Sequence, residues 1–324
     1  MHVLITGAGG MIGARLGLQL ARRGTVNGRQ IDYMTLVDVI APTVPPFAGT
    51  ITSVGLDISV PTAAAQLIAA HPTAGRPDVI FHLAAIVSSH AEADLALGYA
   101  INLDGTRALF EAIRAAACRP RLVFASSTAV FGAPFPDKIP DDFHATPRSS
   151  YGTQKAMAEL LLNDYTRRGF VDGVALRLPT ICIRPGLPNK AASSFYSNIL
   201  REPLAGKSAN LPVPDTTRHW FASPGSAVAF FDHAASLDTS LIGPNRAINM
   251  PGLSATVADQ IEALRGAAGQ KVVDLITRIP DPAIATIVNT WPQNFDTARA
   301  NALGFTADTS FDDIIAAHLA DTSN

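Results

Sequence analysis

A tyrosine and a lysine one helical turn apart are the residues of this sequence best suited to chemistry. Tyr151 and Lys155 stand at positions i and i+4, which are neighbours on one face of a helix. A cation about 4 Å from a phenol, at an effective dielectric constant near 20, stabilises the tyrosinate by up to about 4 kcal/mol. Such a tyrosinate can accept the proton of a substrate hydroxyl while hydride leaves the carbon for a nicotinamide.

A serine-rich segment precedes this pair. Ser126–Gly132 follows the apolar run Leu122–Phe124, and ligands bind at the carboxyl ends of strands in open parallel sheets. Ser127 can therefore donate a hydrogen bond to the reacting oxygen. An ordinary serine-rich turn remains the alternative.

A glycine-rich turn follows the first apolar run of the chain and precedes a helical pattern. Its three glycines have the spacing that makes a tight turn, lets backbone N–H groups approach a pyrophosphate and packs helix against strand. The pattern predicts a dinucleotide site. The cofactor contacts expected here are Gly7, Gly10, Met11, Ile12 and Gly13.

Two acidic residues at strand ends suggest which dinucleotide is bound. Asp38 ends the second strand, where an acid can bind the adenosine ribose diol. No Arg or Lys directly follows Asp38 to offer a 2′-phosphate a counter-charge, and the Asp38 carboxylate would itself repel that phosphate. NAD is therefore favoured over NADP. Asp57 and Ile58, after the third strand, could hold the adenine. For both acids the alternative is a solvated strand end.

The elements that must position these residues alternate along the first half of the chain, which predicts an α/β fold with a doubly wound parallel sheet of Rossmann type. Long helices are expected at Ile12–Arg23, Ala91–Ala117 and Tyr151–Arg168. The predicted strands contain Val3–Ile5, Met34–Val37, Ile51–Val54, Val79–Phe81, Leu122–Phe124 and Val174–Leu176.

After Pro185 the alternation gives way to a segment rich in Pro, Ser and Asn. We expect an NAD-binding domain over 1–184 and a smaller, mainly substrate-binding lobe over 185–324, with possible returns of the chain to the first domain. Helices are predicted near Ser194–Arg201, Pro224–Leu237, Val257–Arg265 and Phe311–Leu319.

Composition narrows the classes of protein. The chain has 324 residues, 48% of them hydrophobic, and a formal charge of −2, which is typical of a globular protein and offers no basic surface for nucleic acid. It has no apolar run long enough for a membrane span and no signal-peptide pattern, so we expect a cytoplasmic protein. Cys118 and Cys182 lack metal-ligand spacing, so we expect packing cysteines and no metal site.

Taken in order, these motifs resemble the extended short-chain dehydrogenase/reductases, including His82–Ala85 and Asn102 with Gly105–Thr106. The resemblance implies that Ser127 is the catalytic hydroxyl, Tyr151 the acid/base, and Lys155 a group that lowers the tyrosine pKa and binds the nicotinamide ribose. It also implies a homodimer through two long helices, with His82 a core residue. Further cofactor contacts are expected at Leu83, Ala84, Ala85, Asn102, Leu178, Pro179 and Thr180.

The rest of the sequence bears on the substrate. Sugar dehydratases of this family carry an Asp-Glu pair where this chain has Thr128–Ala129, so dehydration is disfavoured. Arg218 stands where relatives often bind a diphosphate, and guanidinium also suits a carboxylate. The stretch Leu178–Ser197 resembles that of D-erythronate dehydrogenases, which oxidise the C2 hydroxyl of a four-carbon sugar acid. Substrate contacts are then expected from Ser127, Thr128, Tyr151, Arg184, Asn189 and Arg218.

Two alternatives remain open at this stage. A nucleotide-sugar epimerase would use the same Tyr151, Lys155 and glycine turn. A non-catalytic dinucleotide sensor would have no need of Ser127, Tyr151 and Lys155 together. Structural salt bridges are an alternative role for Arg184 and Arg218.

Overall fold

The computed structural model describes residues 1–186 and 192–322, which form two compact units. Unit 1 comprises Met1–Val130, Pro147–Arg177 and Val228–Ile248. Unit 2 comprises Phe131–Thr146, Leu178–Ala227 and Asn249–Asn324. Each unit therefore contains segments that are distant in sequence.

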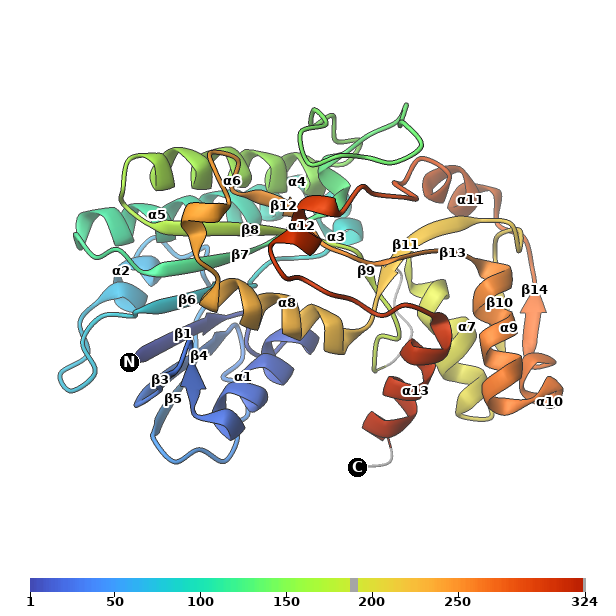
Figure 1. The fold of residues 1–324 in the computed structure, drawn as a ribbon, viewed down its shortest axis with the longest axis horizontal. Helices are drawn as coiled ribbons and strands as arrows, with labels where there is room; N and C mark the ends of the chain where they lie inside the picture. The colour runs from blue at the N-terminus through green and yellow to red at the C-terminus, as the bar shows by residue number, and fades with distance from the viewer. Residues whose placement is uncertain (187–191, 323–324) are drawn as a thin grey trace. The chain divides into compact units, whose positions relative to one another are not determined.

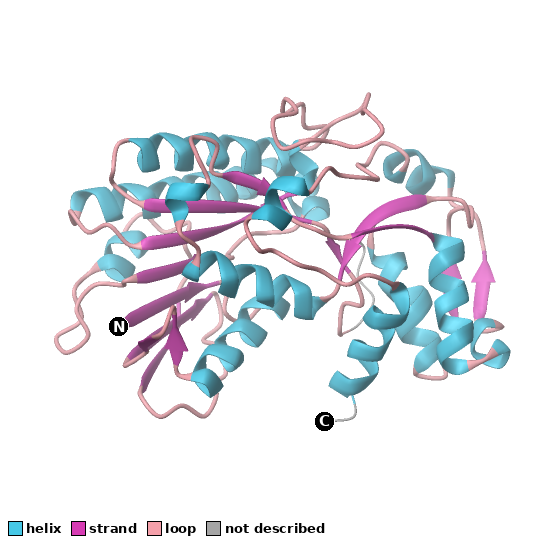
Figure 2. Cartoon of the chain, in the orientation of Figure 1, coloured by secondary structure: helices cyan, strands magenta, loops and turns pink. Residues whose placement is uncertain are grey.

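The centre of unit 1 is a seven-stranded sheet, and Figure 2 shows its strands in magenta between cyan helices. The pairings of β5 with β4, β4 with β1, β1 with β6 and β6 with β7 are all parallel. All six strands predicted from the sequence are present. In spatial order the strands are β12 (Ala247–Asn249), β8 (Asp172–Leu178), β7 (Arg121–Ser127), β6 (Val79–His82), β1 (His2–Thr6), β4 (Tyr33–Asp38) and β5 (Thr50–Gly55).

Helices cover both faces of this sheet, as a doubly wound fold requires (Figure 1). Helix α1 (Met11–Arg23) lies beside the unit 1 part of α8 (Pro224–Ser236), where Gln19 donates a hydrogen bond to Asp232 at 3.1 Å. Helices α5 (Thr106–Ala115) and α6 (Ser150–Arg167) pack together on the other face. The smaller elements of unit 1 are β2 (Thr25–Val26), β3 (Arg29–Gln30), α2 (Ala63–Ile68), the 3-10 turn η2 (Thr128–Val130) and η3 (Thr239–Leu241).

The single long helix predicted over Ala91–Ala117 is wrong. The chain forms α3 (Ser88–Ala93), α4 (Leu95–Gly98), the π-helix η1 (Tyr99–Gly105) and then α5. Asp94 causes the break between the first two, because its backbone is extended and its carboxylate accepts a hydrogen bond from the N–H of Leu97. A side chain that caps a new helix competes with continuation of the old one.

Unit 2 is built from short strands and helices. All four helices predicted after Pro185 are present, but the one at Pro224–Ser236, α8, lies mainly in unit 1. Its sheets are β13-β11-β9 and β10-β14. The elements are β9 (Thr180–Ile181), α7 (Ser194–Leu204), β10 (Ala209–Leu211), β11 (Arg218–Ala222), β13 (Leu253–Thr256), α9 (Val257–Ala268), α10 (Gln270–Val273), β14 (Ile276–Arg278), α11 (Pro282–Val288), α12 (Ala298–Ala302) and α13 (Phe311–Thr322).

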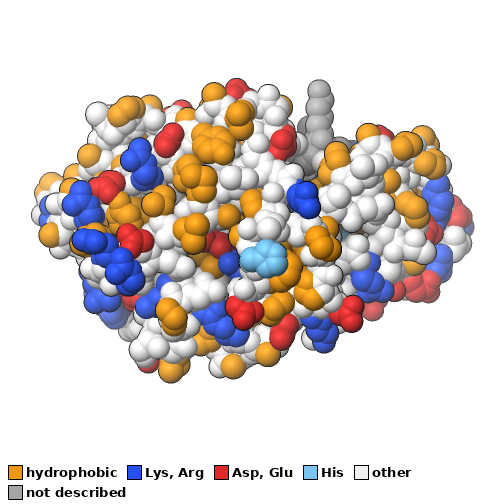
Figure 3. Space-filling view, turned by 90° about the horizontal axis from the view of Figure 1, so that it is seen from above, with side chains coloured by type: hydrophobic (Ala, Val, Ile, Leu, Met, Phe, Trp, Pro, Cys, Tyr) orange, Lys and Arg blue, Asp and Glu red, His pale blue; other side chains and the backbone are white. Residues whose placement is uncertain are grey.

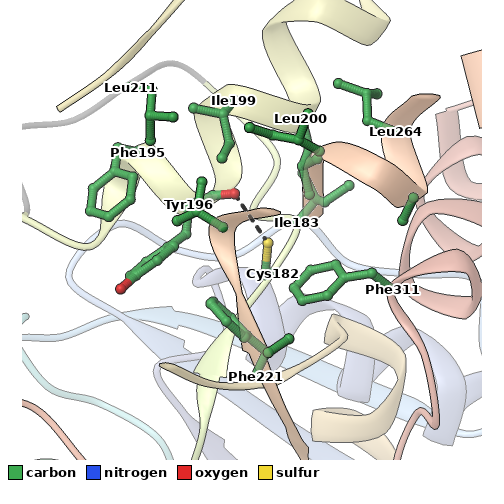
Figure 4. Packing of buried hydrophobic residues seen from close by; sticks show 14 of the residues in the cluster. Cys182, Ile183, Phe195, Tyr196, Ile199, Leu200, Leu211, Phe221, Leu264 and Phe311 are labelled. Carbon is green, nitrogen blue, oxygen red and sulfur yellow. Dashed lines mark hydrogen bonds between the residues drawn. The ribbon is translucent and has the colours of Figure 1, made fainter. Parts of the chain in front are cut away.

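Each unit has its own apolar core. In unit 1, Leu4, Ile80 and Phe124 are fully buried on neighbouring strands. In unit 2, Tyr196, Leu200 and Phe221 are fully buried (Figure 4). No helix within residues 1–186 and 192–322 is both long and apolar enough to cross a membrane.

Candidate active site

The glycine turn of unit 1 brings the ends of β1 and β6 together. Gly7 has a φ of +75°, and a Cβ on it would lie 2.7 Å from the backbone nitrogen of Ala84. A Cβ on Gly13 would lie 2.1 Å from the carbonyl oxygen of Gly7. Only glycine fits at either position, because other residues would collide with backbone atoms.

The first turn of α1 carries the other turn residues named above. Met11, Ile12 and Gly13 open the helix after Gly10, which provides no side-chain cap. The first N–H groups of a helix have no partner within it, so they face outward as donors for an anion. The backbone of Gly10 donates to Gly7 at 3.1 Å and keeps the turn closed.

Asp38 lies against this turn at the end of β4. Its carboxylate accepts hydrogen bonds from the N–H of Gly9 at 2.9 Å and from the N–H of Val39 at 2.8 Å. The acid is half-buried. The structure therefore places a fixed carboxylate beside the glycine turn, as a ribose contact requires.

Asp57 and Ile58 lie apart from the turn, after β5. The Asp57 carboxylate is exposed and accepts a hydrogen bond from the N–H of Ser59 at 2.9 Å. Ile58 lies against η1, where a Cβ on Gly105 would be 3.0 Å from the Ile58 carbonyl oxygen. An adenine contact at these two residues remains a prediction.

Tyr151 and Lys155 lie on the first two turns of α6, with the Lys155 Nζ 5.7 Å from the centroid of the tyrosine ring. The helix begins at Ser149, whose hydroxyl accepts a hydrogen bond from Gly152 N–H at 3.0 Å. A Cβ on Gly152 would lie 2.1 Å from the carbonyl oxygen of Ala129. Gly152 therefore lets the start of α6 approach the segment after β7, a requirement that sequence reasoning missed.

Lys155 is 2% exposed. Its Nζ donates to the carbonyl oxygen of Ala125 on β7 at 2.8 Å and lies 4.7 Å from the Phe124 ring centroid. Burial lowers the pKa of Lys155 to about 7, although the nearby Glu159 carboxylate acts in the opposite direction. The ammonium group therefore titrates near neutral pH.

A buried ion pair lies on the same helix, one turn beyond Lys155. Arg177 on β8 donates to both carboxylate oxygens of Glu159, through Nη2 at 2.8 Å and Nε at 3.0 Å. Ser126 donates to the same carboxylate at 2.5 Å. Glu159 and Arg177 were missed from the sequence, although the spacing of Tyr151, Lys155 and Glu159 at i, i+4 and i+8 indicates one helix face.

Ser127 is the last residue of β7 and is half-buried. Its hydroxyl oxygen accepts a hydrogen bond from Ala129 N–H at 3.1 Å. Thr128, expected to contact substrate, is 8% exposed and begins η2. Because η2 packs against α6, the structure brings Ser127 and Thr128 to the start of the tyrosine helix.

The segment after β6 carries the next expected contacts. Leu83, Ala84 and Ala85 are half-buried beside the glycine turn, and Leu83 N–H donates to Thr6 at 3.0 Å. Asn102 is fully buried, and its amide bonds both backbone groups of Ile86, at 2.9 and 3.1 Å. Its Nδ2 also donates to Gln154 of α6 at 2.8 Å, so Asn102 joins the segment after β6 to α6, and the cofactor contact expected there remains a prediction.

His82 is a core residue in the structure. It is 1% exposed, and its ring nitrogens lie 2.7 Å from the Thr6 hydroxyl and 2.9 Å from the Thr106 hydroxyl. Burial, with the charge of Lys155 adding to it, lowers the pKa of His82 to about 3. The imidazole is neutral at physiological pH.

The remaining expected contacts belong to unit 2. Leu178 ends β8 and Pro179 follows it. The Thr180 hydroxyl lies 2.7 Å from Nε2 of buried His219. Half-buried Arg184 donates from Nε to the Ile181 carbonyl at 3.0 Å. Exposed Arg218 donates to the Ser254 carbonyl at 2.9 Å, and Asn189 lies outside the described residues.

Comparison with known proteins then decides the family. Residues 3–221 match the model of the NAD dependent epimerase/dehydratase family. The chain belongs to this family. The matched range includes the glycine turn, Asp38 and the Tyr151/Lys155 pair, whose roles remain predictions.

Relatives of this family member span its full length. It is 48% identical over 325 residues to a D-erythronate dehydrogenase of Cupriavidus necator, covering 99% of this chain and 98% of the relative. It is 44% identical to a D-erythronate dehydrogenase of Haemophilus influenzae, covering 97% and 98%. A crystal structure described as a nucleoside-diphosphate-sugar epimerase from Agrobacterium tumefaciens matches with 55% identity and a TM-score of 0.96, covering 99% and 94%.

The geometry of unit 1 fits the NAD that the family uses. The turn admits no Cβ at Gly7 or Gly13, because one would meet backbone atoms at 2.7 or 2.1 Å, and a turn this tight lets backbone N–H groups approach a pyrophosphate. The first N–H groups of α1 would hold the diphosphate, and Asp38 would hold the adenosine ribose. The Lys155 ammonium, which donates to the Ala125 carbonyl oxygen at 2.8 Å, would also donate to the nicotinamide ribose hydroxyls. When bound, NAD supplies the hydride acceptor.

Proposed function

We propose that this protein oxidises the C2 hydroxyl of D-erythronate to a 2-keto acid with NAD. The observation that carries the proposal is the Tyr151/Lys155 pair at the start of α6, with the ammonium 5.7 Å from the phenol ring. The names of two relatives at 48% and 44% identity indicate the substrate.

In this proposal Tyr151 takes the proton of the C2 hydroxyl, and the protonated form of Lys155 favours the tyrosinate that does so. Ser127 holds the same hydroxyl oxygen through its own O–H, since its oxygen already accepts from Ala129 N–H. The Glu159–Arg177 pair acts through Lys155, because the carboxylate favours the charged ammonium. Glu159 is thus a positioning residue.

The substrate carboxylate is assigned to the arginines of unit 2. Arg218 is exposed at the start of β11, and its Nη1 donates to the main-chain and hydroxyl oxygens of Ser254, at 2.9 and 3.5 Å. A guanidinium can add a bidentate carboxylate to such contacts. Arg184 is proposed as a second cation for the substrate carboxylate, and Asn189 as a hydrogen-bond partner of a substrate hydroxyl.

The test is NADH formation at 340 nm with D-erythronate, compared with its C2 epimer and with C5 and C6 aldonates. Absorbance growth with D-erythronate and NAD, lost in Tyr151→Phe, is the expected result. Stable NAD binding with no NADH from any aldonate would contradict the proposal.

An epimerase is the second candidate, favoured by the name of the structure that is 55% identical. Such an enzyme keeps its cofactor and shows no net reduction. Stoichiometric NAD after purification, together with interconversion of a UDP-sugar, would select it over the dehydrogenase.

We further propose a cytoplasmic homodimer. Helix α6 exposes Met157 and Leu160, at 40% and 70%, on its outer surface, and apolar side chains on a helix surface favour burial against a second copy. Both cysteines are free thiols, as in a reducing compartment. Light scattering that gives one chain per particle at micromolar concentration would contradict the dimer.

A further inference from the structure

A second polar recess lies in unit 1 at the edge of the sheet where the parallel strands begin, opposite the edge that carries the glycine turn and Ser127. It has a volume of about 430 Å³, within the range of pockets that hold small organic ligands. Four arginines line it against a single acidic residue; the side chains used below are Arg29, Arg76, Asp78, Cys118, Arg119 and Arg121.

Two of these arginines are already paired. Arg29 contacts Asp78 at 3.2 Å. Arg121 contacts Asp172 at 2.8 Å and donates to the carbonyl oxygens of Ala234 and Leu237, each at 2.8 Å. Arg121 therefore has little donor capacity left, whereas Arg29 uses one donor group and has its charge partly balanced by Asp78.

Arg76 and Arg119 differ from them. Both side chains are exposed, and neither forms an ion pair or a side-chain hydrogen bond with any residue of the ranges 1–186 and 192–322. Each guanidinium carries a full positive charge with a planar set of donors that matches a phosphate. The recess thus has two cationic groups available to a ligand.

Both arginines line the recess from segments that lead into two neighbouring strands. Arg76 lies three residues before Val79 at the start of β6, and Arg119 lies two before Arg121 at the start of β7. Val79 and Arg121 are partners in the parallel register of these strands, and adjacent strands are about 4.8 Å apart. In Figure 3, which views the molecule from above, Lys and Arg side chains gather toward the left of the picture, the end of unit 1 where these strands begin.

We propose that this recess binds a ligand carrying a polyphosphate chain, with Arg76 and Arg119 each holding one phosphate group. Inorganic tripolyphosphate and a nucleoside triphosphate share this chemistry. This inference does not depend on the substrate proposed above.

Cys118 provides a direct reporter of occupancy. Its thiol is half-buried in the wall of the recess, whereas the other cysteine, Cys182, is fully buried in unit 2. The charge of Arg76 acts on this thiol by lowering its pKa, against the larger effect of burial. A polyphosphate on Arg76 should therefore slow alkylation of Cys118 both by covering the thiol and by neutralising the cation.

The experiment measures the rate of Cys118 labelling by iodoacetamide in the NAD-saturated protein, with and without tripolyphosphate. NAD is kept saturating because the start of α1 is itself an anion site. Tripolyphosphate at ten times its dissociation constant should slow labelling about tenfold, since only the free fraction reacts. ATP in a parallel arm tests whether a nucleoside adds affinity: tighter protection assigns the recess to nucleotides, equal protection to the polyphosphate alone.

Two double variants make the test specific. Arg76→Gln/Arg119→Gln should lose the protection. Protection is measured as the ratio of labelling rates with and without ligand, because Arg76 also affects the reactivity of Cys118 in the ligand-free protein. Lys207→Gln/Lys271→Gln removes the same charge from unit 2 and should keep it. Unchanged labelling at millimolar tripolyphosphate, or equal protection in both double variants, would overturn the proposal.

Discussion

Helix α6 in unit 1 and helix α7 in unit 2 both bury polar side chains, but they hold them in different charge states. On α6, Lys155 and Glu159 are 2% and 5% exposed, and the pKa of Lys155 is about 7. On α7, Tyr196 is fully buried and stacks on His219 with ring centroids 5.1 Å apart.

His219 and Cys182, both buried beside α7, are neutral at physiological pH, although the last turn of the helix also carries the ion pair Arg201–Glu202. Burial lowers the pKa of His219 to about 3 and raises the pKa of Cys182 to about 12. The Cys182 thiol donates to the Tyr196 carbonyl at 3.4 Å, drawn as the dashed line in Figure 4. The Tyr196 hydroxyl, which points away from the labelled apolar residues, has no hydrogen-bond partner among the described residues.

The difference lies in the charges nearby. Glu159 of α6 forms an ion pair with Arg177 at 2.8 Å, and its carboxylate raises the pKa of Lys155 against the larger effect of burial. For His219 and Cys182 beside α7, burial is the largest effect on the pKa, and it favours the neutral form of each group. We therefore expect proton transfer on the face of α6.

Tyr151→Phe should have the largest effect. It removes the acid/base oxygen, so kcat should fall about 10²- to 10⁴-fold, while NAD affinity changes little. Tyr165→Phe is the matched control, since Tyr165 lies on the same helix and its hydroxyl donates to Glu111. If Tyr151→Phe retained most of the wild-type kcat, α6 would not supply the proton acceptor.

Glu159→Gln should be the most destabilising change. It leaves Arg177, whose side chain is 7% exposed, as an unpaired buried charge, which costs about 3–5 kcal/mol of the free energy of unfolding. Asp164→Asn breaks the exposed Arg167 pair on the same helix, where the side chains are 72% and 50% exposed, and should cost less than about 1 kcal/mol. Urea denaturation measures both, and equal losses would show that the buried pair has no special role.

The Lys155 titration should be visible in the stability of the cofactor-free protein. The folded chain releases above pH 7 a proton that the unfolded lysine retains to about 10.5. Stability therefore rises with pH between these values, by at most about 1.4 kcal/mol per pH unit. The free energy of unfolding, measured by urea denaturation at several pH values, should rise more steeply with pH in the wild type than in Lys155→Met. The same pH dependence in both proteins would rule out the lowered pKa.

The same variant should also affect the rate. Loss of the ammonium removes the charge that favours the tyrosinate, so kcat/KM for oxidation should rise only at higher pH than in the wild type. If kcat/KM of Lys155→Met were lower than that of the wild type at every pH but its pH profile had the same midpoint, Lys155 would act in cofactor binding alone.

Tyr196→Phe should have the smallest effect and the opposite sign. It removes a buried hydroxyl that lacks a partner, so the free energy of unfolding should rise by about 1 kcal/mol. Tyr165→Phe again serves as the control, because it removes a bonded hydroxyl and should lower stability. A loss of stability in Tyr196→Phe would mean that this hydroxyl makes a favourable contact.

Local spacing accounts for what could be predicted from the sequence. The separation of Tyr151 and Lys155, the glycines of the turn and the acid at the end of β4 all act within a few residues of the chain. Helix pitch and turn geometry depend on such short separations, so the element types and the cofactor were predictable. The helix break at Asp94 was locally encoded as well but was masked by the surrounding alanines.

Contacts between distant segments were decided only by the tertiary structure. The Glu159–Arg177 pair joins α6 to β8, Gly152 meets Ala129, and β12 adds a strand from residues 247–249 to a sheet that begins at residue 2. The arginine recess likewise forms where separate strands begin. The pKa of Lys155 depends on burial by all of these elements together, and burial is a property of the packed fold that no spacing along the chain contains.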